Sequence, residues 1–291
     1  MAEPVDRWAR WLGERRFGGD EEMRARAFAD LLIPLRDRVL NGAEPIAGAT
    51  VLDVGCGDGL IAFGALDRGA AGVVFADISR DLLGQCRQLA AEAGVGGRCR
   101  FVETAAENLA PIETASVDVV TARSVLIYVA EKAAAFREFA RVLRPGGRLS
   151  IFEPINSFSQ REWTGSRFFG VDLAPLGDIA AKVLAPYREA VPADDPMLDF
   201  DERDLLSMAE DAGFFPLDLT LTADLRPADA RPWNVFLHSA GNPNLPTLAE
   251  AMDRTLTGEE QAELTRYLRP LIEHGAATRR MAHAYLRARR R

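Results

Sequence analysis

The residues with the clearest capacity for chemistry lie within one short segment, from Val51 to Leu60. An apolar run leads there into three glycines, Gly55, Gly57 and Gly59. Glycine lets a backbone turn tightly and approach a ligand without a side-chain clash, and the amides at a helix N-terminus bind polar or anionic groups. The segment therefore predicts a buried strand, a ligand-binding turn and a helix, and Cys56 is accommodated in the turn because it is small.

Two carboxylates accompany this turn. Asp53 lies inside the apolar run, and Asp77 ends a second run, Val73-Val-Phe-Ala. An acidic residue about 20 positions beyond such a turn is typical of a group that binds ribose hydroxyls. A dinucleotide-binding turn has the pattern G-x-G-x-x-G, which would need glycine at the position of Leu60. The spacing thus indicates a nucleoside cofactor and argues against a nicotinamide oxidoreductase.

The observed pattern, D-x-G-x-G-x-G, resembles the first motif of class I S-adenosylmethionine-dependent methyltransferases. Later segments resemble the family in the same order, namely Asp77-Ile-Ser, Ser116-Val-Asp-Val-Val-Thr-Ala and the segment from Arg141 to Pro154. The resemblance covers residues 45–155. It implies S-adenosylmethionine as cofactor and S-adenosylhomocysteine as product. No aspartate cluster has metal-ligand spacing, so no metal is expected.

The resemblance also implies roles for individual residues. Asp53 helps to position the methionine end of the cofactor, Asp77 accepts hydrogen bonds from both ribose hydroxyls, and Ile78 packs on the adenine ring. The family's usual adenine-binding aspartate falls on Ala105, so backbone groups near Ala106 or a nearby polar residue are expected to replace it. The cofactor-binding residues are expected to be Asp53, Gly55, Cys56, Gly57, Gly59, Asp77, Ile78, Ala105, Ala106, Glu107, Arg123 and Ser124.

Residues after the fourth and fifth strands are the candidates on the acceptor side. Arg123 and Tyr128 follow the fourth strand, and Glu153 ends the fifth. Glu153 would hold or deprotonate the acceptor, or else it closes the sheet edge. A sulfonium is already a strong electrophile, so positioning and desolvation can supply much of the rate. The three histidines are expected to be surface or packing residues.

Alternating apolar and helical patterns predict the elements that position these residues. Strands are expected near 50–55, 72–77, 99–103, 117–121 and 146–153, with helices near 59–69, 79–94 and 130–143. Such alternation is typical of an α/β fold with a doubly wound, largely parallel sheet. Ligands then bind beyond the carboxyl ends of the strands, where the strand order reverses.

Further segments extend this core. Residues 1–44 are expected to be helices that form a lid over the core, residues 45–154. Residues 155–200, which carry Trp163 and other aromatic residues, are expected to form a helical cap over the substrate pocket. Residues 201–240 should complete a seven-stranded sheet, with a helix at 201–212 and strands at 214–223 and 233–239. Residues 241–291 are expected to be a C-terminal helical extension, with helices near 247–256 and 258–288.

Composition excludes several function classes. The formal net charge of −8 argues against nucleic-acid binding, which depends on many basic side chains. The three cysteines show no spacing typical of a zinc site or a disulfide framework. No signal peptide or long apolar run is visible, so we expect a cytoplasmic protein without a membrane partner.

The sequence therefore predicts a methyltransferase acting on a small, partly apolar organic molecule such as a natural product or a quinone. The aromatic residues of the expected cap favour an apolar acceptor. Two alternatives stay open: a protein that binds the cofactor without transferring a methyl group, and a protein or RNA methyltransferase. The sequence leaves open whether the chain is a monomer or a homodimer.

Overall fold

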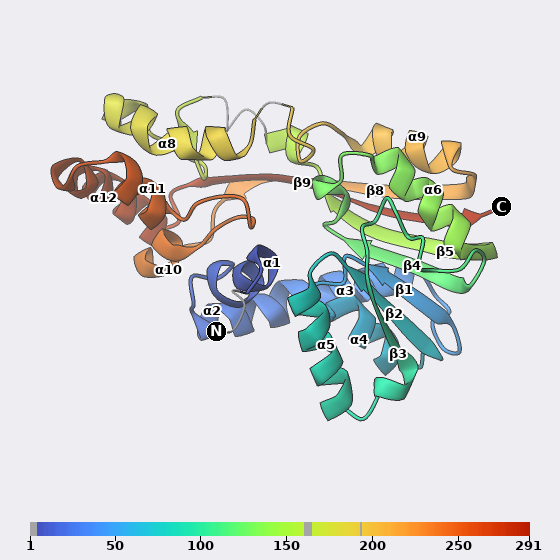
Figure 1. The fold of residues 1–291 in the computed structure, drawn as a ribbon. Helices are drawn as coiled ribbons and strands as arrows, with labels where there is room; N and C mark the ends of the chain where they lie inside the picture. The colour runs from blue at the N-terminus through green and yellow to red at the C-terminus, as the bar shows by residue number, and fades with distance from the viewer. Residues whose placement is uncertain (1–4, 160–164, 193) are drawn as a thin grey trace.

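A seven-stranded sheet forms the centre of the molecule in the computed structural model, which describes residues 5–159, 165–192 and 194–291 (Figure 1). The strand order is β3-β2-β1-β4-β5-β9-β8. The first five strands are parallel, and β9 is antiparallel to both β5 and β8. The strands are β1 (Thr50–Val54), β2 (Gly72–Asp77), β3 (Cys99–Glu103), β4 (Val117–Arg123), β5 (Leu143–Pro154), β8 (Phe214–Pro227) and β9 (Thr278–Arg290). This arrangement confirms the doubly wound α/β class, and the strand order reverses between β1 and β4.

Helices cover both faces of the sheet. The helices α3 (Ile33–Gly42), α4 (Leu60–Asp67) and α5 (Arg80–Glu92) share one apolar core, which includes Val51 and Phe75. On the other face α6 (Lys132–Val142) and α9 (Glu202–Asp211) pack around a second core that includes Leu149 and Phe214. Asp201 caps α9, because its side chain accepts hydrogen bonds from the amides of Arg203 and Asp204.

The strands β8 and β9 extend past the end of β5 and continue there as a two-stranded ribbon. Residues 278–282 of β9 pair with β8 alone, because the pairing with β5 stops at Pro154 and His283. The ribbon leads to a third apolar core away from the sheet (Figure 1). This core joins two insertions, one after β5 and one between β8 and β9. Its elements are β6 (Arg167–Phe168), β7 (Val171–Asp172), α8 (Asp178–Ala190), α10 (Trp233–His238), α11 (Leu248–Thr255) and α12 (Gly258–Glu273).

The sheet is completed by a segment that was expected to be helical. The expected strand at 233–239 is the short helix α10, and the expected helix at 258–288 ends at Glu273. Residues 278–290 form β9, the last strand along the chain, which lies between β5 and the edge strand β8. The alanines and arginines of this segment have high helix propensity, but its burial alternates, with Ala282, Ala284, Leu286 and Ala288 buried between more exposed residues.

The C-terminal helices α11 and α12 therefore lie between two sheet strands rather than after the sheet. Thr247 and Thr257 cap them, because each threonine side chain accepts a hydrogen bond from the amide of the glutamate three residues later. The segment after β5 is less helical than expected: it contains the β6–β7 hairpin as well as α8. Trp163 lies outside the described residues. No described helix is long and apolar enough to cross a membrane.

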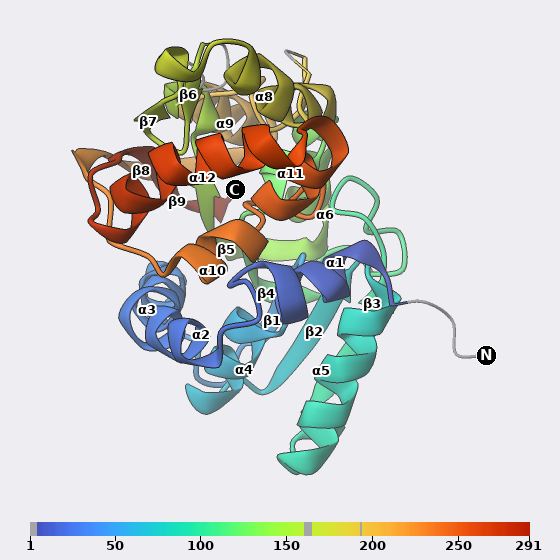
Figure 2. The ribbon, with the colours of Figure 1, turned by 90° about the vertical axis from the view of Figure 1, so that its left-hand side faces the viewer.

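The N-terminal helices are α1 (Arg7–Arg10), α2 (Glu21–Ala27) and α3, joined by the π-helical turns η1 (Trp11–Arg15) and η2 (Phe28–Leu32). Figure 2 shows α1 between the sheet strands β1 and β2 and the helices α10 and α11. The N-terminal segment thus lies where the sheet faces the third apolar core.

Candidate active site

The glycine turn between β1 and α4 can be built only from glycine at its key positions. Gly55, Gly57 and Gly59 all have positive φ angles, between 54° and 80°. A Cβ added at Gly55 would lie 2.3 Å from Cγ2 of Val125, and one at Gly59 would lie 2.6 Å from the ring of Phe63. Both approaches are too close for a side chain. The Cys56 amide donates to the carbonyl oxygen of Ala76 (3.0 Å), which ties the turn to β2.

Asp77 is held against this turn from the end of β2. One carboxylate oxygen accepts a hydrogen bond from the Gly57 amide and the other accepts one from the Ser79 amide, each at 2.8 Å. Burial raises the pKa of Asp77, and these two hydrogen bonds oppose that effect. The next residue, Ile78, is 51% exposed. The structure thus places a fixed carboxylate and an accessible apolar side chain side by side.

Asp53 lies behind the turn and is fully buried. Its carboxylate accepts a hydrogen bond from the Thr121 hydroxyl on β4 (2.8 Å) and another from the Ala62 amide in α4 (3.1 Å). Burial raises the pKa of Asp53 to about 7, while Thr121 and the charge of Arg123 oppose the rise. Asp53 therefore joins β1, β4 and the first turn of α4 behind the glycine turn.

Glu153 is also fully buried, at the end of β5. Its carboxylate accepts hydrogen bonds from the backbone amides of Val125, Leu126 and Ile127, at 2.9, 3.0 and 3.3 Å. Burial raises its pKa to about 7, against the effect of these amides. Both oxygens are thus occupied in shaping the loop after β4, which is the arrangement of a residue that closes the sheet edge.

Arg123 ends β4, and the loop that Glu153 holds follows it with two further candidate residues, Ser124 and Tyr128. Ser124 has a φ of +56°, a region that a residue other than glycine adopts at a cost. Such strain is often stored at functional sites. Burial raises the pKa of Tyr128 above its ordinary value, and the charge of Glu153 raises it further. Tyr128 is therefore a neutral hydrogen-bonding group.

The expected adenine segment lies next to Asp77. The Thr104 amide donates to the carbonyl oxygen of Asp77 (2.9 Å), and the Asn108 amide donates to the carbonyl oxygen of Ala105 (3.1 Å). Ala106 is buried in the second core and Glu107 is exposed. The structure thus brings Ala105, Ala106 and Glu107 to the same edge as Asp77.

The N-terminal segment closes over this edge. The Ser79 hydroxyl donates to the carboxylate of Asp6 (2.6 Å), and the Asp6 amide donates to the carboxylate of Asp81 (2.7 Å). The ring of Trp8 packs edge-on against that of Tyr128, with centroids 4.8 Å apart. A side chain at Gly57 would lie 3.5 Å from Cδ1 of Leu12. The first N-terminal helix is therefore in contact with both the cofactor side and the acceptor side of the candidate site.

Arg16 is a further charged group of this site that motif reasoning missed. Its guanidinium lies over the rings of Trp11 and Phe17, 5.4 and 5.3 Å from their centroids. Burial lowers its pKa to about 10, with a further contribution from the charge of Arg123, while Asp58 opposes the shift. The apolar stripe of the N-terminal helix was the available signal, since Trp8, Trp11 and Leu12 recur on one face.

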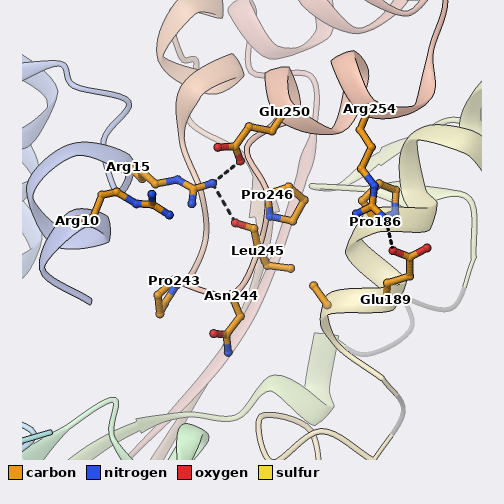
Figure 3. Close-up of a pocket in the computed structure, with 11 residues that line it drawn as sticks. Arg10, Arg15, Pro186, Glu189, Pro243, Asn244, Leu245, Pro246, Glu250 and Arg254 are labelled. Carbon is orange, nitrogen blue, oxygen red and sulfur yellow. Dashed lines mark hydrogen bonds and ion pairs between the residues drawn. The ribbon is translucent and has the colours of Figure 1, made fainter. Parts of the chain in front are cut away.

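The same segment also contacts the third apolar core. The indole of Trp11 donates to the carbonyl oxygen of Ala240 (2.8 Å), whose amide donates to the carbonyl oxygen of Arg15 (2.8 Å). Arg15 also pairs with Glu250 on α11 and donates to the carbonyl oxygen of Leu245 (Figure 3). These groups border a cavity of about 440 Å³ lined by Arg10, Arg15, Pro186, Glu189, Ala190, Pro243, Asn244, Leu245, Pro246, Glu250 and Arg254. None of the predicted site residues lines it.

Comparison with known proteins gives consistent results. Residues 52–151 match the family model described as a methyltransferase domain. The ubiquinone/menaquinone biosynthesis C-methyltransferase of Hahella chejuensis is 36% identical over 57% of this chain and 67% of its own length. The nocamycin O-methyltransferase of Saccharothrix syringae is 34% identical over 57% of this chain and 56% of its own length. The chain thus matches between about half and two thirds of the length of these relatives.

A solved structure shows the same fold along nearly the whole chain. The geranyl diphosphate C-methyltransferase of Streptomyces coelicolor A3(2) has a TM-score of 0.56 and 16% identity, with 99% of this chain and 89% of that chain covered. The glycine turn, Asp77 and the reversal of strand order between β1 and β4 lie within the matched segment. This chain therefore belongs to the class I S-adenosylmethionine-dependent methyltransferases.

Proposed function

We propose that this protein transfers a methyl group from S-adenosylmethionine to a small, partly apolar organic molecule. The carrying observation is the Asp77 carboxylate, which the amides of Gly57 and Ser79 fix beside the glycine turn, where the strand order reverses. A ribose needs such a pair of acceptor oxygens, and the turn leaves no side chain in the way. When bound, S-adenosylmethionine supplies an electrophilic methyl group.

The residues divide into those that would touch the cofactor and those that would position them. Asp77 would bind the ribose, Ile78 would pack on the adenine, and the backbone of Gly55, Cys56, Gly57 and Gly59 would line the methionine end. Ala105, Ala106 and Glu107 would border the adenine, whose polar edge would meet backbone groups. Asp53 would act through α4 and the turn, because it is fully buried behind them and its carboxylate is bound by Thr121 and Ala62.

On the acceptor side we propose that Glu153 is a positioning residue rather than a proton acceptor. Its oxygens already accept three amide hydrogen bonds, and it is fully buried. It would fix Arg123, Ser124 and Tyr128 around the reacting atoms. Arg16 and Arg123 would supply positive charge for the carboxylate of the cofactor or an acidic group of the acceptor.

Exclusion of water would provide a large part of the rate. The lid formed by Trp8, Leu12 and Arg16 covers the turn, and aromatic groups surround it. A closed apolar site holds an acceptor in line with the methyl group and removes competing water. The named relatives methylate organic molecules, which supports an acceptor of this class.

Calorimetric titration of the purified protein with S-adenosylmethionine, S-adenosylhomocysteine and NAD tests the proposal. We expect binding of the two adenosyl ligands alone, weakened at least about 100-fold by Asp77→Ala, because two ribose hydrogen bonds to a charged group are lost. Asp67→Ala, at the exposed far end of α4, is the control and should bind as the wild type does. Binding of NAD alone, or binding indifferent to Asp77→Ala, would contradict the assignment. Release of S-adenosylhomocysteine with candidate acceptors then separates a transferase from a protein that only binds the cofactor.

A further inference from the structure

The two edges of the central sheet differ in length and in chemistry. The edge strand β3 has five residues, whereas β8 at the other edge has 14. The described backbone hydrogen bonds of β8 are made with β9, so its outer edge has no partner strand among the described residues. A long, unpaired edge is a template for pairing with another strand, and proteins usually shorten or interrupt such edges.

Proline and lysine, which often protect edge strands, are absent from the middle of β8, although it carries Asp218, Asp224 and Arg226. Pro216 and Pro227 lie near its ends, and no proline or lysine lies between them. Leu221 and Leu225 are 42% and 59% exposed, on the face that carries the more buried Leu217 and Leu219. On this face of β8, Leu217 and Leu219 are partly buried against the core, and the row of apolar side chains continues beyond them as the exposed Leu221 and Leu225.

The opposite face of β8 carries alternating polar groups, Asp218, Thr220, Thr222, Asp224 and Arg226. Asp218 pairs with Arg287 on β9 (3.1 Å), and Asp224 pairs with Arg226 (2.8 Å). Asp218, Thr220 and Arg226 are exposed and Thr222 and Asp224 are half-buried, and ion pairs at such positions contribute little to folding stability. They remain available to contact a further strand.

This pattern is complementary to itself in one antiparallel register. With the two-fold axis at Thr222, Asp218 faces Arg226 of the partner subunit, and Leu219 faces Leu225 of the partner subunit. Leu221 then faces Ala223 of the partner subunit, so apolar side chains meet apolar ones and opposite charges meet twice. Moving the axis to Leu221 instead places Asp218 opposite Asp224 of the partner subunit, which is repulsive.

We propose that two copies of this chain form a dimer by antiparallel pairing of their β8 strands about Thr222, which joins the two sheets into one. We assign a second copy to this edge because the charges and apolar groups of β8 are complementary to those of the same strand running in the opposite direction. Pairing would begin after Pro216 and end at Pro227, since proline cannot donate to a ladder.

Sedimentation velocity and cross-linking test this dimer. We expect the 31.8 kDa chain to sediment as a dimer at micromolar concentration. Thr222→Cys should form an interchain disulfide under mild oxidation, because two copies of this residue meet at the axis. Thr220→Cys is the matched control: it has the same residue type and the same face, but its two copies are far apart in this register, so it should not cross-link.

Arg226→Asp provides a second test that leaves the glycine turn unchanged. It places like charges opposite Asp218 of the partner subunit twice in each dimer, so the dissociation constant should rise at least about tenfold. Binding of S-adenosylhomocysteine by each chain should stay the same, which would show that the variant is folded. A monomeric wild type, equal cross-linking at positions 220 and 222, or an Arg226→Asp dimer of unchanged affinity would overturn the proposal.

Discussion

The glycine turn and the contact between the N-terminal segment and the third apolar core are built in opposite ways. In the turn, a buried carboxylate is held by backbone amides that lie close to it in the sequence, as Asp77 is by those of Gly57 and Ser79. In the lid contact, Trp11 and Arg15 reach residues more than 220 positions away, at Ala240 and Glu250, and the side chain of Glu250 is 56% exposed. The first region is rigid and local, and the second is assembled from distant, partly solvated segments.

The difference separates the two halves of the proposed reaction. A fixed cradle suits a cofactor that is the same in every turnover, since pre-organised donors and acceptors lose little entropy on binding. A lid held by few polar contacts suits entry and release, because weakly held segments open most easily. Substitutions in the turn should therefore change folding and binding strongly, and substitutions in the lid should change mainly exchange rates.

The largest effect is expected from Gly55→Ala. The added methyl group would clash with Val125 and would require an alanine at a φ of +61°, so we expect a loss of about 3–5 kcal/mol in the free energy of unfolding. Gly84→Ala is the control, because this position in α5 has no atom within 4 Å of the added Cβ and a helix favours alanine. Urea unfolding followed by circular dichroism measures both, and similar stabilities for the two variants would contradict the rigid-cradle description.

The same contrast between local and long-range contacts explains which parts of the fold the sequence could predict. The turn, Asp77 and strands β1 to β5 could be predicted because their signals are local: glycine spacing and short apolar runs. The strand β9 could not, because alanine and arginine favour a helix in isolation and only pairing with β5 and β8 makes residues 278–290 extended.

For individual side chains, too, the position could be predicted from the sequence more readily than the contacts. A glutamate at the end of β5 is visible in the sequence, but its three amide partners depend on how the loop after β4 folds. Arg16 belongs to no recognisable motif, because its place in the site depends on packing against aromatic rings of the N-terminal segment. The sequence therefore predicts groups near the strand ends better than it predicts their neighbours.

A smaller effect is expected in the pH dependence of stability. In the folded protein the pKa of Asp53 is about 7, against 3.8 in an unfolded chain, so the folded state binds more protons between these values. Stability should therefore fall as the pH rises from 5 to 8, and Asp53→Asn should lose about 2–4 kcal/mol of this dependence. Thermal unfolding of wild type and variant across this range measures the difference between their pH profiles. Burial lowers the pKa of His283, which has the opposite effect on stability, but this contribution is the same in both proteins and cancels.

Glu153 should leave part of the slope in the Asp53→Asn variant, since its own pKa is raised from 4.5 to about 7 by burial. Asp67→Asn, at an exposed position, should leave the full wild-type slope. If Asp53→Asn and the wild type have parallel pH profiles, Asp53 is ionised throughout this range, and the amide and hydroxyl hydrogen bonds outweigh its burial.

The smallest effect is expected in the lid. Trp11→Phe keeps an aromatic ring but removes the hydrogen bond to Ala240, which is worth about 1 kcal/mol. The dissociation rate of S-adenosylhomocysteine should then rise about two- to fivefold, because the closed lid loses one of its contacts to the third apolar core, and folding stability should fall by no more than about 1 kcal/mol. Surface plasmon resonance measures the rate, and Arg10→Ala is the control, since Arg10 lines the same cavity without a side-chain hydrogen bond among the described contacts. Equal rates in the wild type and Trp11→Phe would mean that the N-terminal segment is held by its contacts with Ser79, Asp81 and Tyr128, so that the lid would belong to the rigid region rather than to the mobile one.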